Sequence, residues 1–169
     1  MIQKKVCMVG VQGTGKTSLV QRFVHSMFSE RYLSTVGVKI DRKALDVDGT
    51  QITIVLWDLA GRDGQEDITT SYLRGSHGIL YVADGTRKET CDQLEELRAL
   101  ARQAAGEVPE LLALNKIDLT DQWALKKNDE ESLAREWDLA RTSAKSGAGV
   151  EEAFQRLGRA TLATKEARS

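Results

Sequence analysis

Residues 10–17 read GVQGTGKT, and this stretch decides the fold. Two glycines separated by four residues and followed by Lys and Thr fit the phosphate-loop pattern. Glycine lets the backbone bend and approach a ligand closely, because it has no Cβ. Such a turn presents N–H groups to an anion, and the positive end of the following helix points to the same place. We therefore expect Lys16 to reach phosphate groups and Thr17 to offer a hydroxyl to Mg²⁺.

The segments on either side of this loop supply the context that the pattern requires. Residues 6–9 form an apolar run that predicts a buried strand. Downstream, apolar side chains recur at helical spacing, at Leu19, Val20, Phe23 and Val24. The order of strand, glycine loop and helix favours a phosphate site over a chance match in a surface loop.

The composition is that of an ordinary globular chain. Of its 169 residues 41% are hydrophobic and 29% are charged, so we expect a single domain over residues 1–169. The formal net charge of −1 gives no reason to expect a nucleic-acid partner, which a strong basic excess would indicate. Cys7 and Cys91 are interpreted as reduced thiols of a cytoplasmic protein. Since no bilayer-spanning run or lipidation motif is present, we expect no intrinsic membrane anchor and membrane association only through a partner or a missing tail.

Strand and helix patterns alternate through the rest of the chain. Apolar runs predict strands at residues 38–47, 51–57, 79–83, 111–114 and about 138–140. Apolar stripes or weaker periodicity predict helices at 91–105 and 126–136 and a last helix from Val150. Asp48-Gly49 joins the first two runs as an antiparallel hairpin. The alternation indicates an α/β domain with a mostly parallel sheet.

Polar residues follow several of these predicted strands. The phosphate loop, Asp58, Asn115 and Ser143 each lie just after a strand. In open α/β sheets ligands bind outside the carboxyl ends of the strands, so we expect these groups to converge on one edge. A carboxylate such as Asp58, with Gly61 three residues later, resembles a metal-binding acid followed by a hinge.

The segment Asn115-Lys116-Ile117-Asp118 predicts which base is bound. An ionised Asp118 can accept two N–H bonds from guanine, whereas adenine has no donor at N1 and would leave a buried charge unpaired. The stem of Lys116 can lie along the base, and residues 143–145 (Ser-Ala-Lys) can donate a backbone N–H to guanine O6 and support Asp118. Alone, this pattern would be a polar turn; its position after the phosphate loop and Asp58 favours a guanine site.

With these motifs in place, the chain resembles the Ras superfamily of small GTPases, and most closely its Rab-like branch. The resemblance covers essentially the whole chain and rests on residues 10–18, 32–38, 57–61, 71–75, 115–118 and 143–145. It implies a P-loop NTPase G domain with a six-stranded, mostly parallel sheet, one antiparallel strand and about five helices. It also implies a molecular switch with effector proteins, an exchange factor and a GTPase-activating protein, and we favour a monomer.

The same resemblance assigns site residues, with GTP or GDP and Mg²⁺ as ligands. Phe28 would stack against guanine, Thr35 would bind Mg²⁺ and the γ-phosphate, Asp58 would hold Mg²⁺ through water, and the Gly61 N–H would sense the γ-phosphate. The metal set is Thr17, Thr35 and Asp58, and the catalytic candidates are Lys16, Thr35 and Gly61. Gln65 is added as a catalytic candidate that could replace the family's usual Gln if residues 62–64 fold back. The nucleotide set is Gln12, Gly13, Thr14, Gly15, Lys16, Thr17, Ser18, Phe28, Tyr32, Thr35, Gly61, Asn115, Lys116, Asp118, Ser143, Ala144 and Lys145.

Three features depart from the family pattern. Arg62 stands where the family usually places a water-positioning Gln, and Gln65 comes three residues later. Gln12 occupies a loop position that is usually small, and the usual prenylated cysteine tail is absent. Because Arg has donors but no acceptor, it cannot orient the attacking water as Gln does, so we expect slow hydrolysis.

Three functional hypotheses follow from these residues. The leading one is a guanine-nucleotide switch that hydrolyses GTP slowly and signals through nucleotide-dependent loops. The alternative, motivated by Arg62 and Gln12, is a nucleotide-binding regulatory module with negligible turnover. A metabolic phosphate-loop kinase is the third, although it has no need of residues 115–118.

Overall fold

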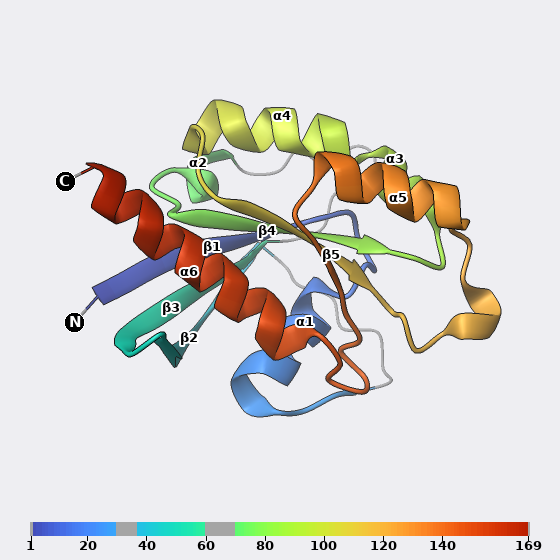
Figure 1. Cartoon of the computed structure of the whole chain (residues 1–169), viewed down its shortest axis with the longest axis horizontal. Coiled ribbons are helices and arrows are strands. Elements are labelled where there is room, and N and C mark those ends of the chain that lie inside the picture. Colours follow the sequence, from blue (N-terminus) through green and yellow to red (C-terminus); the bar gives the residue numbers. More distant parts are fainter. Residues whose placement is uncertain (1, 30–36, 60–69, 169) are drawn as a thin grey trace.

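The computed structural model describes residues 2–29, 37–59 and 70–168, with side chains as far as residue 164. Six strands form one sheet in the order β2-β3-β1-β4-β5-β6 (Figure 1). Only the β2–β3 pair is antiparallel; the other four pairings are parallel. The strands are β1 (Ile2–Val9), β2 (Val38–Val47), β3 (Thr50–Leu59), β4 (Gly78–Asp84), β5 (Glu110–Asn115) and β6 (Leu139–Arg141).

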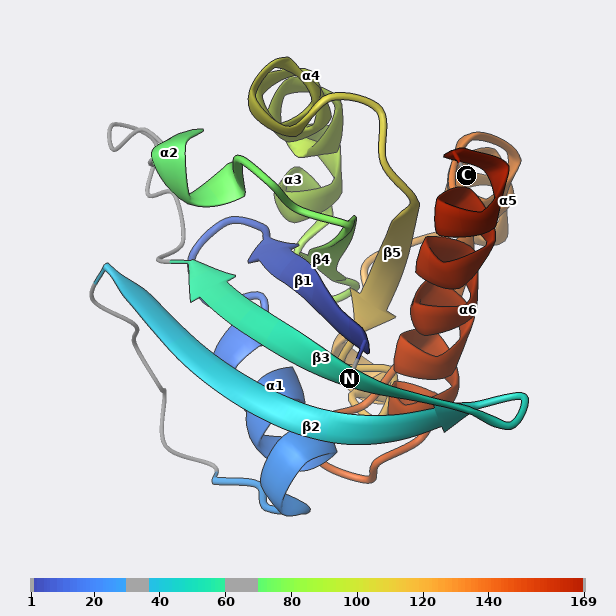
Figure 2. The same ribbon diagram turned by 90° about the vertical axis from the view of Figure 1, so that its left-hand side faces the viewer.

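Helices cover both faces of this sheet (Figure 2). They are α1 (Lys16–His25), α2 (Thr70–Leu73), α3 (Lys88–Asp92), α4 (Leu94–Ala105), α5 (Lys127–Glu136) and α6 (Val150–Arg168), with a 3-10 turn at Thr120–Gln122. Apolar side chains of α1 and α6 pack on one face, and those of α2 and α4 pack on the other. Within the described part of the chain, none of the helices is both long enough and apolar enough to cross a membrane.

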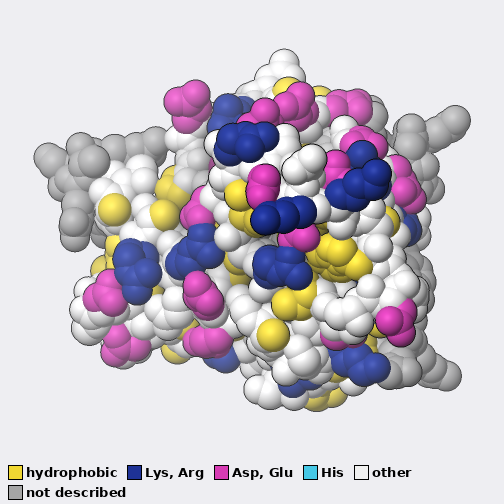
Figure 3. All heavy atoms as spheres, turned by 45° about the vertical axis from the view of Figure 1, so that its right-hand side comes forward, with side chains coloured by type: hydrophobic (Ala, Val, Ile, Leu, Met, Phe, Trp, Pro, Cys, Tyr) yellow, Lys and Arg dark blue, Asp and Glu magenta, His cyan; other side chains and the backbone are white. Residues whose placement is uncertain are grey.

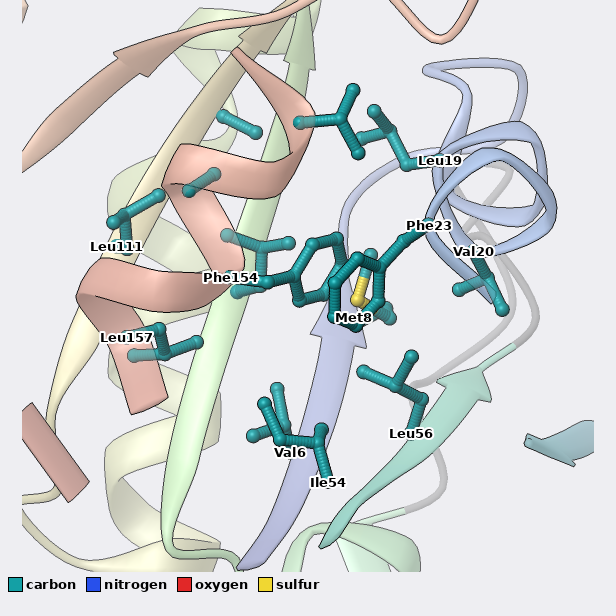
Figure 4. Close-up of a cluster of buried hydrophobic side chains, with 14 of the residues drawn as sticks. Val6, Met8, Leu19, Val20, Phe23, Ile54, Leu56, Leu111, Phe154 and Leu157 are labelled. Carbon is teal, nitrogen blue, oxygen red and sulfur yellow. The ribbon is translucent and has the colours of Figure 1, made fainter. Parts of the chain in front are cut away.

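The core on the α1–α6 face is closed by two aromatic rings. Phe23 of α1 and Phe154 of α6 stack with their centroids 3.9 Å apart and their planes 10° apart (Figure 4). Both are almost fully buried, and Met8 of the central strand lies close to them. Because α1 begins at the phosphate loop, this stack fixes the helix that carries Lys16 against the last helix.

The hairpin between β2 and β3 follows the sequence prediction. Asp48 and Gly49 both have positive φ, at 51° and 89°, which suits the tight two-residue turns that match the twist of the strands. The Gly49 N–H donates to the Asp46 carboxylate at 2.8 Å, which fixes the turn further.

The predicted α/β fold with one antiparallel strand is confirmed. The main local difference is in the predicted helix at 91–105, which is divided at Gln93 into α3 and α4. The Thr90 hydroxyl lies within hydrogen-bond distance of Asp84 O and Arg87 O and so ties α3 to the end of β4. The single-domain assignment of residues 1–169 stays a prediction.

Candidate nucleotide-binding site

The glycine loop lies between β1 and α1 and is tightly enclosed. Gly13 and Gly15 have φ of 81° and 103°, in the left-handed region that favours glycine. A Cβ on Gly15 would lie 2.3 Å from Nδ2 of Asn115, and one on Gly10 would lie 2.5 Å from the Val82 carbonyl oxygen. The loop can therefore hold this path only with glycine at both positions.

Lys16 places a cation inside this loop. Its side chain is 6% exposed, and Nζ donates to the carbonyl oxygens of Gly10 and Val11 at 2.9 and 3.1 Å. Burial lowers the pKa of Lys16 to about 8; Asp58 opposes this effect and Arg87 adds to it. A buried ammonium whose charged form is disfavoured is stabilised by an anion, so the loop is prepared for phosphate.

An oxygen pair suited to a hard cation lies beside Lys16. The Thr17 hydroxyl donates to Oδ2 of Asp58 at 2.7 Å, and Asp58 is fully buried at the end of β3. A hydroxyl and a carboxylate are the ligand types that Mg²⁺ prefers. The two residues therefore fit the metal role that the sequence suggested.

Asn115 and Lys116 hold the glycine loop to the end of β5. Asn115 Nδ2 donates to Thr14 O at 3.0 Å, and its Oδ1 accepts from the Thr142 hydroxyl at 3.0 Å. Lys116 has a positive φ of 70°, and its Nζ donates to Gly13 O at 2.9 Å. The two residues connect the phosphate loop to the segments that follow β5 and β6.

Asp118 and Ser143 meet at the far side of the same edge. The Ser143 hydroxyl donates to Oδ1 of Asp118 at 2.8 Å. Ser143 is buried, whereas Asp118 is exposed, so one residue fixes the carboxylate and the other presents it. Ser143 therefore bonds one carboxylate oxygen, Oδ1. The other, Oδ2, belongs to the same side chain, which the sequence predicts to bind guanine.

Asp84 and Arg87 belong to the site, although the sequence did not identify them. Asp84, 1% exposed at the end of β4, lies 3.0 Å from Nζ of Lys116 and accepts a 3.1 Å bond from Arg87 Nε. Arg87 Nη2 also donates to Gln12 O in the phosphate loop at 3.0 Å. Burial alone would raise the pKa of Asp84, but hydrogen bonds from Thr86 and Lys116 outweigh it and hold the pKa below its ordinary value. The only sequence feature that could have indicated Asp84 is an acidic residue at the end of a buried strand.

The remaining predicted residues divide into described and undescribed ones. Phe28 follows α1 and is 37% exposed, and the Gln12 side chain is exposed. Thr14 and Ala144 are buried, Ser18 is partly buried and Lys145 is exposed. Tyr32, Thr35, Gly61, Arg62 and Gln65 lie outside the described residues, so their roles stay predictions.

Comparison with known proteins agrees with this geometry. The model of the Ras family matches residues 5–163. The Ras-related protein Rab-1 of Theileria annulata is 37% identical over 160 residues, covering 92% of this chain and 73% of that protein. Human Rab-8B is 35% identical over 158 residues, covering 92% and 76%, and bovine Rab-13 is 35% identical over 161 residues, covering 94% and 79%.

Proposed function

Because this chain belongs to the Ras family, we propose that the site described above holds GTP or GDP together with Mg²⁺. Family membership itself makes the chain a Rab-like small GTPase, a guanine-nucleotide switch that hydrolyses GTP slowly. The residues that carry out binding and catalysis in this particular chain are our assignment.

The observation that carries the proposal is the connection between two binding elements. Lys16 occupies the phosphate loop, Asp118 is held by Ser143, and Asn115 bonds Thr14 in the loop while accepting from Thr142 beside Ser143. One hydrogen-bonded framework thus spaces a phosphate-binding cation from a base-reading carboxylate. The covalent linkage through the sugar limits how far phosphate and base can lie apart, so a preorganised spacing favours ligands that carry both groups at that separation.

Each end of the site has its own chemistry. Lys16 neutralises phosphate charge, the loop N–H groups bind the phosphate oxygens, and Asp118 accepts from guanine N1 and N2. Thr17 and Asp58 would hold Mg²⁺, which when bound would neutralise phosphate charge. We propose the further roles of Thr35 and Gly61 from the family resemblance alone, and that of Gln65 as a replacement for the Gln that the family usually has at position 62.

Regulation would run through partners that read the nucleotide state. Effectors, an exchange factor and a GTPase-activating protein are general to the family, and we propose the same classes here. Basic and acidic side chains are interspersed on the face that Figure 3 shows, in keeping with the net charge of −1 and with protein rather than nucleic-acid partners. We place the chain in the cytoplasm on the basis of the family.

A binding experiment tests the proposal directly. Nucleotide released from the purified protein by denaturation should be GDP or GTP, and GDP should displace a fluorescent guanine nucleotide far better than ADP does. Chelation of Mg²⁺ should speed nucleotide release. Equal competition by ADP and GDP would defeat the assignment of Asp118, and release insensitive to chelation would defeat that of Thr17 and Asp58.

A further inference from the structure

An arginine outside the sequence motifs holds the base-binding loop. Arg22 lies in the last turn of α1, and its Nε donates to the Ala144 carbonyl oxygen at 2.7 Å. Its Nη2 donates to the next carbonyl oxygen, that of Lys145. A planar guanidinium can hold two successive carbonyl groups in one orientation, because its donors form a rigid fork.

The two captured carbonyls fix the direction of the N–H groups behind them. In a trans peptide the C=O and the following N–H point in opposite directions. When Lys145 O points to Arg22, the Ser146 N–H points away, and it donates to the Ser143 hydroxyl oxygen at 3.0 Å. That hydroxyl donates in turn to Asp118. A continuous chain of bonds therefore runs from Arg22 to the carboxylate that reads the base.

The loop is shaped to surround the arginine side chain. Gly147 has a φ of 87°, its N–H donates to Ser143 O at 2.8 Å, and a Cβ there would lie 3.7 Å from Cδ of Arg22. At Gly149, whose φ is 72°, a Cβ would lie 2.0 Å from the Arg141 carbonyl oxygen. The loop backbone thus has little freedom to choose another path.

Arg22 stands on a helix that is itself fixed. The next residue, Phe23, stacks on Phe154, and the same helix begins at Lys16 in the phosphate loop. The guanidinium therefore joins the base-binding loop to the helix that begins at the phosphate loop, through two backbone carbonyl oxygens.

We propose that Arg22 is a positioning residue for base recognition, which acts through the Lys145–Ser146 peptide and the Ser143 hydroxyl on Asp118. This inference rests on the proposed function. It assigns Arg22 to the fidelity of guanine selection, beyond any contribution to overall affinity.

Inosine diphosphate provides the probe, because it differs from GDP only by lacking the 2-amino group that Asp118 would bind. The ratio of the two dissociation constants is measured for the wild type and for Arg22→Ala. The wild type should prefer GDP by roughly 10-fold to 100-fold, as a hydrogen bond to a charged group supplies. In Arg22→Ala this preference should fall by roughly 2-fold to 12-fold, the range of one net hydrogen bond.

The ratio separates positioning from a merely structural role. A loosened fold weakens GDP and inosine diphosphate equally and leaves the ratio unchanged, and that result in a folded Arg22→Ala would overturn the proposal. Arg159→Ala is the matched control. Arg159 also makes two hydrogen bonds through its guanidinium, but to Asp48 in the turn between β2 and β3, which is not part of the proposed site. Arg159→Ala should keep the wild-type ratio.

Two further arms keep the test decisive. If Arg22→Ala does not fold, Arg22→Lys retains the charge but not the fork and should also lower the ratio, and an unchanged ratio would refute the idea. A wild type that binds both diphosphates equally would count against the Asp118 assignment in the proposed function, whereas a selective wild type with equally selective Arg22 variants would count against Arg22 alone.

Discussion

Replacement of Lys16 by Met tests the electrostatic account of the phosphate loop. The substitution keeps the length of the side chain and removes a buried ammonium. Burial shifts the pKa of Lys16 from 10.5 to about 8, and each pKa unit corresponds to about 1.4 kcal/mol. In the nucleotide-free protein the charged form is therefore disfavoured by about 3 kcal/mol relative to the unfolded chain.

The sign of the pH dependence follows from proton binding. Below about pH 8 Lys16 is protonated in both states, so the penalty is constant. Between pH 8 and 10.5 the folded protein gives up its proton while the unfolded chain keeps it, so the free energy of unfolding rises with pH. By pH 10 this gain amounts to about 2 to 3 kcal/mol. Lys16→Met has no such proton to lose.

Urea unfolding of nucleotide-free protein at pH 7 and pH 10 measures this gain. The difference in unfolding free energy between wild type and Lys16→Met should change by about 2 to 3 kcal/mol in favour of the wild type as the pH rises. Lys127→Met is the matched control, because the Lys127 side chain is 89% exposed and its replacement should leave the pH dependence as in the wild type.

Parallel pH profiles for wild type and Lys16→Met would refute the argument, because they would mean that burial does not disfavour the Lys16 charge. A second comparison repeats the measurements at pH 7 and pH 10 with saturating GDP and Mg²⁺. Bound phosphate should offset the penalty at pH 7, so the wild type should lose its extra dependence on pH. Lys16→Met should bind GDP far more weakly.

Three other predictions concern the base, the core and turnover. Asp118→Asn should shift preference from GDP toward xanthosine diphosphate by roughly 10-fold or more, measured by competition, because the xanthine O2 accepts where guanine N2 donates. Phe154→Ala should lower the free energy of unfolding by about 3 to 5 kcal/mol in urea titration, because it removes the stacked ring that joins α6 to α1. Single-turnover hydrolysis by the wild type should not exceed about 10⁻⁴ s⁻¹, and Arg62→Gln should be faster. A fast wild type that Gln65→Ala abolishes would instead place catalysis on Gln65.

The sequence was sufficient to predict the frame of this protein. Strands buried on both faces leave continuous apolar runs, and Asp48-Gly49 leaves a distinctive turn, so the strands and the antiparallel pair could be predicted. The phosphate loop could be predicted because its glycines leave no room for a Cβ, which would lie 2.5 Å from the Val82 carbonyl oxygen at Gly10 and 2.3 Å from Asn115 Nδ2 at Gly15. Where one residue type alone fits, sequence and structure agree.

Contacts that join distant segments could not be predicted in the same way. The sequence identified Asn115 and Lys116 as parts of a base motif, but not their bonds to Thr14 O and Gly13 O. The break at Gln93 was also missed, because the apolar stripe of α4 does not indicate where the preceding helix, α3, ends. The Thr90 hydroxyl that ties α3 to the end of β4 bonds backbone oxygens, which the sequence pattern does not record.

Arg22 and Arg87 were missed for the same physical reason. Each holds its loop by a carbonyl oxygen, at Ala144 and at Gln12, and every residue type offers that oxygen. A sequence pattern records side chains, so a partner that is only backbone leaves no trace in it. The arrangement also explains how Gln12 is accommodated in the described structure: the loop is held by its main chain, and the Gln12 side chain points into solvent. Side chains in the phosphate loop can therefore vary wherever there is room for a Cβ. The loop carbonyl groups are held by Lys16 within the motif and by Arg87, Asn115 and Lys116 outside it.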